Sequence, residues 1–147
     1  MAAARGALVD EELRRVRLFD GLTDVQVATV AALCRVESLA AAEPLFHEGD
    51  TSEGLTIVVA GEVEVLRQEQ VVATLGPGST VGEMGLIERR PRSATARARG
   101  ETRVLSLASE DFDQVTRQDP TLGMTILRNL ACQLSERLRT TTEGVTA

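Results

Sequence analysis

Two side chains of opposite charge, Glu83 and Arg92, lie nine residues apart in a glycine-rich part of the chain. The segment that begins at Gly82 follows a predicted strand and is too short for a free-standing helix, but its composition suits a single helical turn. The first N–H groups of such a turn have no backbone partner and attract an anion, and glycine lets a ligand approach the backbone closely. Arg92 offers a planar fork of donors for phosphate oxygens, and Ser93 adds a hydroxyl. This spacing indicates a site for a small phosphate-containing anion.

Glu83 narrows the choice of anion. A carboxylate beside a phosphate is repulsive unless it accepts a hydrogen bond from the ligand, and the 2′-hydroxyl of a ribose can donate one. A cyclic nucleotide carries a single negative charge on its phosphate, so one arginine and several backbone amides suffice without a metal ion. The expected ligand is therefore a cyclic nucleotide, cAMP or cGMP, and we expect no cofactor and no metal.

The elements that position these residues form a mainly β fold with flanking helices. Helical spacing of apolar residues up to about Arg35 predicts an N-terminal helical pair, broken at residues 19–22 and capped again at Thr23. Short β-branched runs separated by turns follow, at the spacing of a jelly-roll-like β-roll of eight strands. Ser109 is the expected N-cap of the next helix, and Pro120 begins the last one. We expect one domain, with a helical segment over 1–35, the β-roll over 36–108, the anion-binding segment over 82–95 and C-terminal helices over 109–147.

Composition excludes several classes of function. The chain has 147 residues, a formal net charge of −6 and a pI near 4.9, which argues against a nucleic-acid surface. The lone His47 has no nucleophile or orienting network around it that would make an enzyme. Cys34 and Cys132 are predicted to be two buried thiols. The chain shows neither a secretory signal nor an apolar stretch near the ~20 residues that span a membrane. We therefore expect a non-enzymatic cytoplasmic protein that binds neither nucleic acid nor membrane.

The segments Gly82–Ile87 and Pro91–Thr95 together resemble the phosphate-binding cassette of the cyclic-nucleotide-binding domain family. The resemblance covers most of the range from Leu18 to Val145, because other segments match the family's strands and turns: Leu45–Asp50, Ile57–Val63 and Leu75–Gly78. It implies that Glu83 accepts the ribose 2′-hydroxyl and that Arg92 pairs with the cyclic phosphate. Gly82, Ser93 and Ala94 would donate hydrogen bonds to the same anion, with Met84 in the same cassette. In this family, ligand capture reorients the last helix against the β-roll, so the resemblance implies a regulatory switch.

The last helix carries a heptad seam. Its apolar positions recur in alternating steps of three and four: Met124, Leu127, Ala131, Leu134, Leu138, Thr141 and Val145. A second stripe, Ile126 and Leu130, is expected to hold the helix against its own domain, which leaves the seam for a homodimer through the 122–145 helix. By the same resemblance, Thr141 and Thr142 would contact the base, one of them across the dimer. The sequence after this helix leaves no room for a helix-turn-helix, so we expect a regulatory module without its own DNA-binding domain, acting on an unknown effector protein.

The same residues also allow interpretations that involve no ligand and no partner. Glu83 and Arg92 could form an internal ion pair in a pocket that binds nothing, and Thr141 and Thr142 could be frayed surface residues. The seam could pack within the chain. Several arginines are most simply solvated: Arg89, Arg90, Arg97, Arg99 and Arg103. The alternative function is a ligand-free β-roll that serves for dimerisation or protein docking. Ser93 does not decide the base, and we favour cAMP weakly over cGMP.

Overall fold

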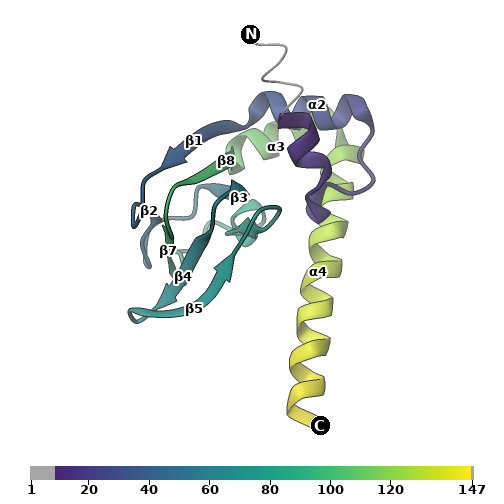
Figure 1. The fold of residues 1–147 in the computed structure, drawn as a ribbon. Coiled ribbons are helices and arrows are strands. Elements are labelled where there is room, and N and C mark those ends of the chain that lie inside the picture. The colour runs from purple at the N-terminus through teal and green to yellow at the C-terminus, as the bar shows by residue number, and fades with distance from the viewer. Residues whose placement is uncertain (1–8, 147) are drawn as a thin grey trace.

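The computed structural model describes the backbone of residues 9–146 and the side chains of residues 9–140. Residues 9–14 are helical. The later helices are η1 (Arg17–Phe19), α2 (Asp24–Leu33), η2 (Glu83–Leu86), α3 (Ser109–Gln118) and α4 (Pro120–Thr146). The strands are β1 (Arg35–Leu39), β2 (Pro44–Phe46), β3 (Gly54–Ala60), β4 (Val63–Arg67), β5 (Gln70–Leu75), β6 (Thr80–Val81), β7 (Thr95–Ala98) and β8 (Thr102–Ala108). The β-roll lies beside a helical layer, from which the long helix α4 projects (Figure 1).

The eight strands form two four-stranded antiparallel sheets, with the orders β1-β8-β3-β6 and β2-β7-β4-β5. This arrangement confirms the predicted β-roll with flanking helices. The one-turn helix η2 interrupts it between β6 and β7, as expected from the short segment after Gly82. The break between the N-terminal helices is also where the sequence places it. Thr23 and Gln26 form a reciprocal capping box at the start of α2, with Gln26 N donating to Thr23 Oγ1 over 3.2 Å.

The first sheet has apolar side chains on both faces, because each face is covered. On the outer face, Ile57 and Leu105 pack with the helices in the main hydrophobic core. On the inner face, Val58 and Val104 lie in a smaller core between the two sheets. Double coverage explains why β3 reads as a continuous apolar run instead of alternating with polar residues. The first sheet thus connects the helical layer to the interior of the roll.

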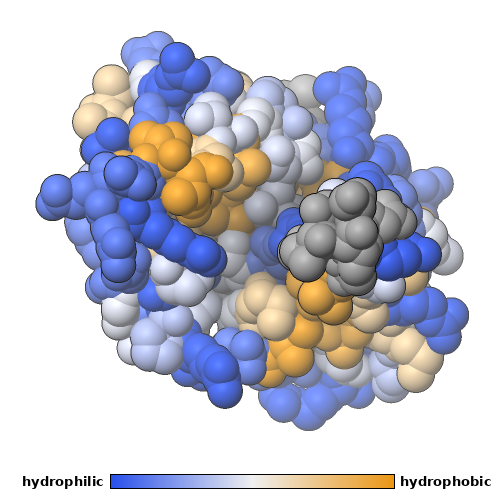
Figure 2. Space-filling model, turned by 90° about the horizontal axis from the view of Figure 1, so that it is seen from below, coloured by the Kyte–Doolittle hydropathy of each residue, from blue (hydrophilic) through white to orange (hydrophobic). Residues whose placement is uncertain are grey.

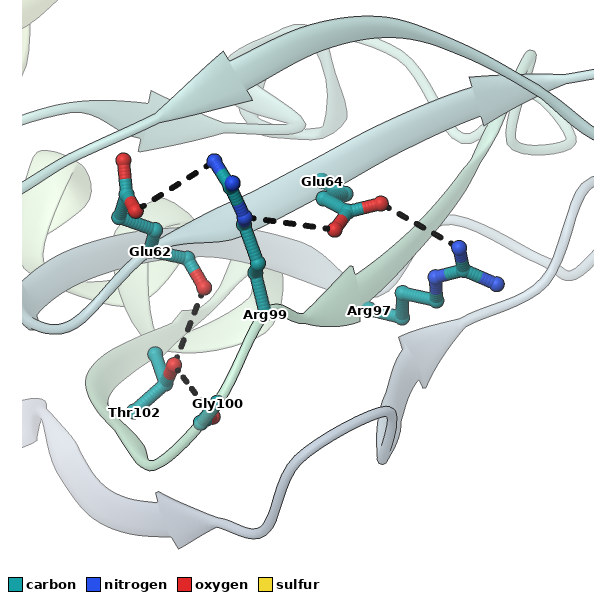
Figure 3. A network of polar contacts seen from close by, with 6 residues as sticks. All are labelled: Glu62, Glu64, Arg97, Arg99, Gly100 and Thr102. Carbon is teal, nitrogen blue, oxygen red and sulfur yellow. Dashed lines mark hydrogen bonds and ion pairs between the residues drawn. The ribbon is translucent and has the colours of Figure 1, made fainter.

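The second sheet has one wet face, as the alternation of glutamate and valine before and along β4 predicts. Glu64 and Arg97 are directly opposite each other in the β4–β7 register, and their side chains approach to 3.3 Å. Arg99 bridges Glu62 and Glu64, at 3.7 and 3.9 Å (Figure 3). Ala96 and Ala98, on either side of Arg97, face inward and are buried. Arg97 and Arg99 are therefore parts of an ion-pair network on the outer face, remote from the cassette residues in their contacts.

Helix α4 is fixed to the domain by its first half. Leu122, Ile126 and Leu130 are fully buried in the main core. The amide of Asn129 donates to the carbonyl oxygens of Leu18 and Asp20, at 2.9 and 2.8 Å, and so ties α4 to the N-terminal elbow. The predicted stripe of Ile126 and Leu130 thus packs on the domain. Of the seam, Leu134 also packs against the main core, whereas Met124, Leu127 and Leu138 are 59%, 37% and 68% exposed.

Two details differ from the sequence predictions. Ser109 is not the N-cap of α3, because Ala108 holds that position and the Ser109 hydroxyl donates instead to the Gly85 carbonyl. The prediction of two buried thiols is wrong for Cys132, which is exposed on α4. Cys34 is half-buried, and burial raises the pKa of its thiol to about 12.

No described helix has the length and apolar character needed to cross a membrane. Nor do three or more potential metal ligands gather anywhere among residues whose side chains are described.

The contact between α3 and α4 generates a stability prediction. A Cβ added at Gly123 would collide with the Thr116 side chain, whose hydroxyl is buried without a hydrogen-bond partner among the described residues. Gly123→Ala should therefore destabilise the protein by about 1–3 kcal/mol, although alanine is the better helix former. In a Thr116→Ala background the two shortest contacts are absent and only the Cβ of residue 116 remains close, at 2.8 Å, so Gly123→Ala should cost clearly less than in the wild-type background. Urea unfolding of the four proteins measures this coupling; equal losses in both backgrounds would contradict it.

Candidate functional site

The cassette is built around a sharp backbone turn at Gly82. This residue follows β6 and adopts a left-handed conformation, with φ of 74°, before η2 begins at Glu83. A Cβ added at Gly82 would collide with Nη1 of Arg92. Glycine is therefore required here for two reasons, the backbone conformation and the close approach of a guanidinium. The structure thus brings together Gly82 and Arg92, which are ten residues apart in the sequence and both belong to the predicted site.

Arg92 points into the roll. Its Nη2 donates to the carbonyl oxygen of Gly54 over 3.1 Å, and its Cζ lies 4.1 Å from the centre of the Phe46 ring. Its Nε is buried and has no hydrogen-bond partner within the described part of the chain. Burial lowers the pKa of the Arg92 guanidinium, and the carboxylates of Glu53 and Asp50 oppose that shift. The guanidinium is therefore partly buried, and not all of its donors are satisfied within the described residues.

The backbone of Arg92 is fixed as firmly as its side chain. Arg92 N donates to Asp50 O over 2.7 Å, and Gly49 N donates to Arg92 O over 2.9 Å. These two hydrogen bonds tie the second half of the cassette to the loop between β2 and β3. The same loop also carries the acidic side chain of Asp50. The Arg92 cation and a carboxylate that balances its charge are therefore held in place by one loop.

Glu83 has a partner that the sequence did not predict. The residue is only 6% exposed, and its Oε1 accepts a hydrogen bond from Nη1 of Arg137 over 2.7 Å. The second carboxylate oxygen accepts no hydrogen bond from the described residues. No ion pair joins Glu83 to Arg92 within the same set, so the internal pair considered from the sequence is replaced by one with α4. From the sequence alone, the only indication of this role for Arg137 was that it is a positively charged residue on the predicted last helix.

The other end of the cassette is held by α3. Gly85 O accepts a 2.6 Å hydrogen bond from the buried Ser109 hydroxyl and a 3.3 Å bond from Arg89 Nη1. Arg89 also pairs with Asp113 of α3 at 2.8 Å. Arg89 is exposed and lies in a loop, as expected, but its side chain also helps to fasten η2 to α3. Arg90, in contrast, is largely exposed beside Glu88.

The remaining predicted residues are placed as follows. Ala94 is 8% exposed, whereas Ser93 and Met84 are exposed. The exposure of Ser93 and Met84 leaves this surface of the cassette accessible. Thr141 and Thr142 belong to α4, but their side chains lie outside the described residues, so the structure does not test their contacts.

An open groove of about 1090 Å³ separates the roll from α4. Arg67, Val72 and Leu75 of the β4–β5 hairpin line one side, and Gln133, Arg137 and Thr140 of α4 line the other. Figure 1 shows the corresponding separation between the hairpin and the lower part of α4. Arg137 connects this groove to the cassette through Glu83. The groove is therefore positioned to take the part of a ligand that extends beyond the cassette.

Comparison with known proteins identifies the class of domain. Residues 36–119 match the family model of the cyclic nucleotide-binding domain, and the chain belongs to this family of regulatory domains. It is 35% identical over 127 residues to the cyclic AMP receptor protein of Thermus thermophilus, covering 83% of this chain and 57% of that protein. It is 31% identical over 128 residues to glutaminase 1 of Bradyrhizobium diazoefficiens, covering 86% of this chain and 21% of that protein. The chain therefore spans about half of one relative and about a fifth of the other.

A solved structure agrees with this assignment. The N-terminal domain of a transcriptional regulator from Streptomyces coelicolor A3(2) is 33% identical, with a TM-score of 0.78 over 91% of this chain and 94% of that one. The similarity therefore covers nearly the whole of a domain that was solved separately. The resemblance stated from the cassette sequence is confirmed.

Proposed function

We propose that the chain is a regulatory sensor that binds a cyclic nucleotide reversibly, with cAMP weakly preferred over cGMP. The observation that carries this proposal is Arg92, a desolvated guanidinium directed inward beside Gly82 with one buried N–H unpaired. A cyclic phosphate needs one charged partner and several amides, and this geometry supplies the charged partner. The names of the Thermus thermophilus relative and of other cAMP-activated regulators support cAMP as the ligand.

The free carboxylate oxygen of Glu83 supports a role in sugar recognition. While Oε1 is engaged by Arg137, Oε2 remains available to accept the ribose 2′-hydroxyl. One carboxylate would then contact both the ligand and α4. Binding at the cassette would change the free energy of α4's position, since the two contacts share Glu83. We propose this shared carboxylate as the means by which ligand capture alters the last helix.

We further propose a homodimer through α4. The seam residues Met124, Leu127 and Leu138 are exposed, while the stripe that anchors the helix to its own domain is fully buried. Figure 2 views the molecule from the side toward which α4 projects in Figure 1, and apolar surface is exposed on this face. A second copy would cover this seam with the matching heptad positions. Thr141 and Thr142 remain proposed base contacts, one of them across this dimer.

The second candidate function is a ligand-free docking module, and one specific observation favours it. Glu83 and Arg92 already have internal partners, Arg137 and Gly54 O. A roll that had lost its ligand would retain such contacts for structural reasons. That function predicts no change in melting temperature with any cyclic nucleotide. The activity and effector of a longer protein that carried this domain would follow from its other parts.

Arg92→Ala should weaken cAMP binding by about 2–5 kcal/mol, because the bound phosphate loses its charged partner. Isothermal titration calorimetry measures the change. Arg90→Ala is the matched control, since the side chain of Arg90 is 80% exposed and should contribute little. An affinity for cAMP that is the same in Arg92→Ala and wild type would contradict the assignment. Thermal melting of both variants checks that the Phe46 contact is not required for folding.

Glu83→Ala should cost about 1.5–3 kcal/mol in binding of cAMP and little in binding of 2′-deoxy-cAMP. The double comparison isolates the hydrogen bond to the ribose, because any disturbance of Arg137 affects both ligands equally. Equal losses for the two ligands would show that Glu83 has no role at the sugar.

Leu138→Arg should weaken the proposed dimer at least about tenfold, or about 1.4 kcal/mol, since it puts a charge into an apolar seam. Sedimentation equilibrium measures the association. Cys132→Arg is the control: Cys132 is also exposed on α4 but lies outside the heptad positions. A wild-type protein that is monomeric both with and without cAMP would contradict the dimer.

A further inference from the structure

A second cavity lies on the other side of Arg92, between the inner face of the first sheet and β2. It measures about 650 Å³, within the usual range for small-molecule sites. Of the predicted cassette residues, only Arg92 lines it. It also shares no lining residue with the groove beside α4. The cavity therefore shares Arg92, but no other predicted cassette residue, with the proposed cyclic-nucleotide site.

The floor of this cavity is a row of hydrogen-bond donors. Arg35 of β1 is in register with Ser106 of β8, which is in register with Thr56 of β3. All three line the cavity, so they form one transverse row across neighbouring strands. Thr56 is only 8% exposed, yet its hydroxyl makes no hydrogen bond within the described residues. This hydroxyl is therefore available to a ligand that enters the cavity.

Arg92 also lines the cavity, although the surrounding protein covers its unpaired Nε. Arg35 and Ser106 likewise have no side-chain hydrogen bond or ion pair in the described part of the chain. Converging donors of this kind match the two oxygens of a carboxylate.

The rim of the cavity has the opposite charge. Glu37, Glu53 and Asp111 line it and form no ion pair with any described residue. Together with the arginines they make the cavity amphoteric, with donors in the floor and carboxylates at its edges. A ligand with only a negative charge would be repelled by the rim acids. A ligand with only a positive charge would leave the donors of the floor without hydrogen-bond partners. A zwitterion satisfies both.

Apolar side chains complete the lining. Leu39, Leu45 and Phe46 border the cavity and pack against the inner core of the roll. An aliphatic group placed against them would be removed from water. The cavity therefore offers three surfaces: donors, acids and an apolar wall.

We propose that this cavity binds a free aliphatic α-amino acid of about the size of leucine. Its carboxylate lies against Arg35, Ser106 and Thr56, its ammonium group faces the rim acids, and its side chain rests on Leu39 and Leu45. This ligand is distinct from the cyclic nucleotide, and the inference does not depend on cyclic-nucleotide binding.

The test is calorimetric titration of the full chain with L-leucine in the absence of nucleotide. Saturable binding is expected, and Arg35→Gln should weaken it about tenfold or more. Thr56→Val, which keeps the side-chain shape, should also weaken it. Ser38→Ala is the control, because Ser38 lies on the opposite face of β1 from Arg35 and does not line the cavity. Melting curves of each variant show whether it folds.

Two analogues define the ligand class. Isoamylamine lacks the carboxylate and 4-methylpentanoate lacks the ammonium group, and both should bind at least about tenfold more weakly than L-leucine. No L-leucine binding up to ~10 mM, or equal binding of isoamylamine, would overturn the proposal. A separate cAMP titration distinguishes it from the proposed function: if Arg35→Gln and Thr56→Val abolish cAMP binding, the cavity belongs to the nucleotide site and the proposal is wrong.

Discussion

A carboxylate buried inside a protein needs a charged or hydrogen-bonded partner, and Glu83 finds that partner on α4. The cassette and the last helix are separated by dozens of residues, yet the 2.7 Å contact between Glu83 and Arg137 joins them directly. Removing one partner of such a pair leaves an uncompensated charge, so the position of α4 and the state of the cassette are energetically linked. Because Arg137 also lines the groove beside the roll, the same contact lies where a ligand would extend.

The rest of the fold holds the two ends of this contact in place. Asn129 and the buried stripe of α4 fix the helix to the N-terminal elbow, while Ser109 and Arg89 fasten η2 to α3. The first sheet carries the helical layer on one face and the inner core on the other. The cassette is thus held from both directions. Beyond Leu130, α4 is held by Leu134 against the main core, by an ion pair between Glu136 and Arg17 at 3.3 Å, and by Arg137. Under the proposed function, this half of the helix is the element that a ligand would reposition.

The sequence predicted the parts of the fold whose signals are local. Turn glycines and β-branched runs indicated the roll, Thr23 indicated a helix start, and the spacing of Ile126 and Leu130 indicated the buried stripe of α4. The cassette was predictable because Gly82, Glu83, Arg92 and Ser93 occur in one short segment with a recognisable pattern. Arg137 was not, because its pairing with Glu83 crosses 54 residues. Ser109 was predicted to be a helix cap because sequence patterns consider only neighbouring residues. In the structure its hydroxyl instead makes a tertiary contact with Gly85. Cys132 looked buried only because its stretch of helix is apolar.

The most direct test of the account is a calorimetric titration of the wild-type chain with cAMP, paired with thermal melting. The account predicts saturable binding of one nucleotide per chain, and a stabilisation of about 2.7 kcal/mol at a cAMP concentration of ~100 Kd. cGMP should bind somewhat more weakly. A chain that folds but shows neither heat nor a melting shift with either nucleotide would contradict the account and leave the docking module as the function of this domain.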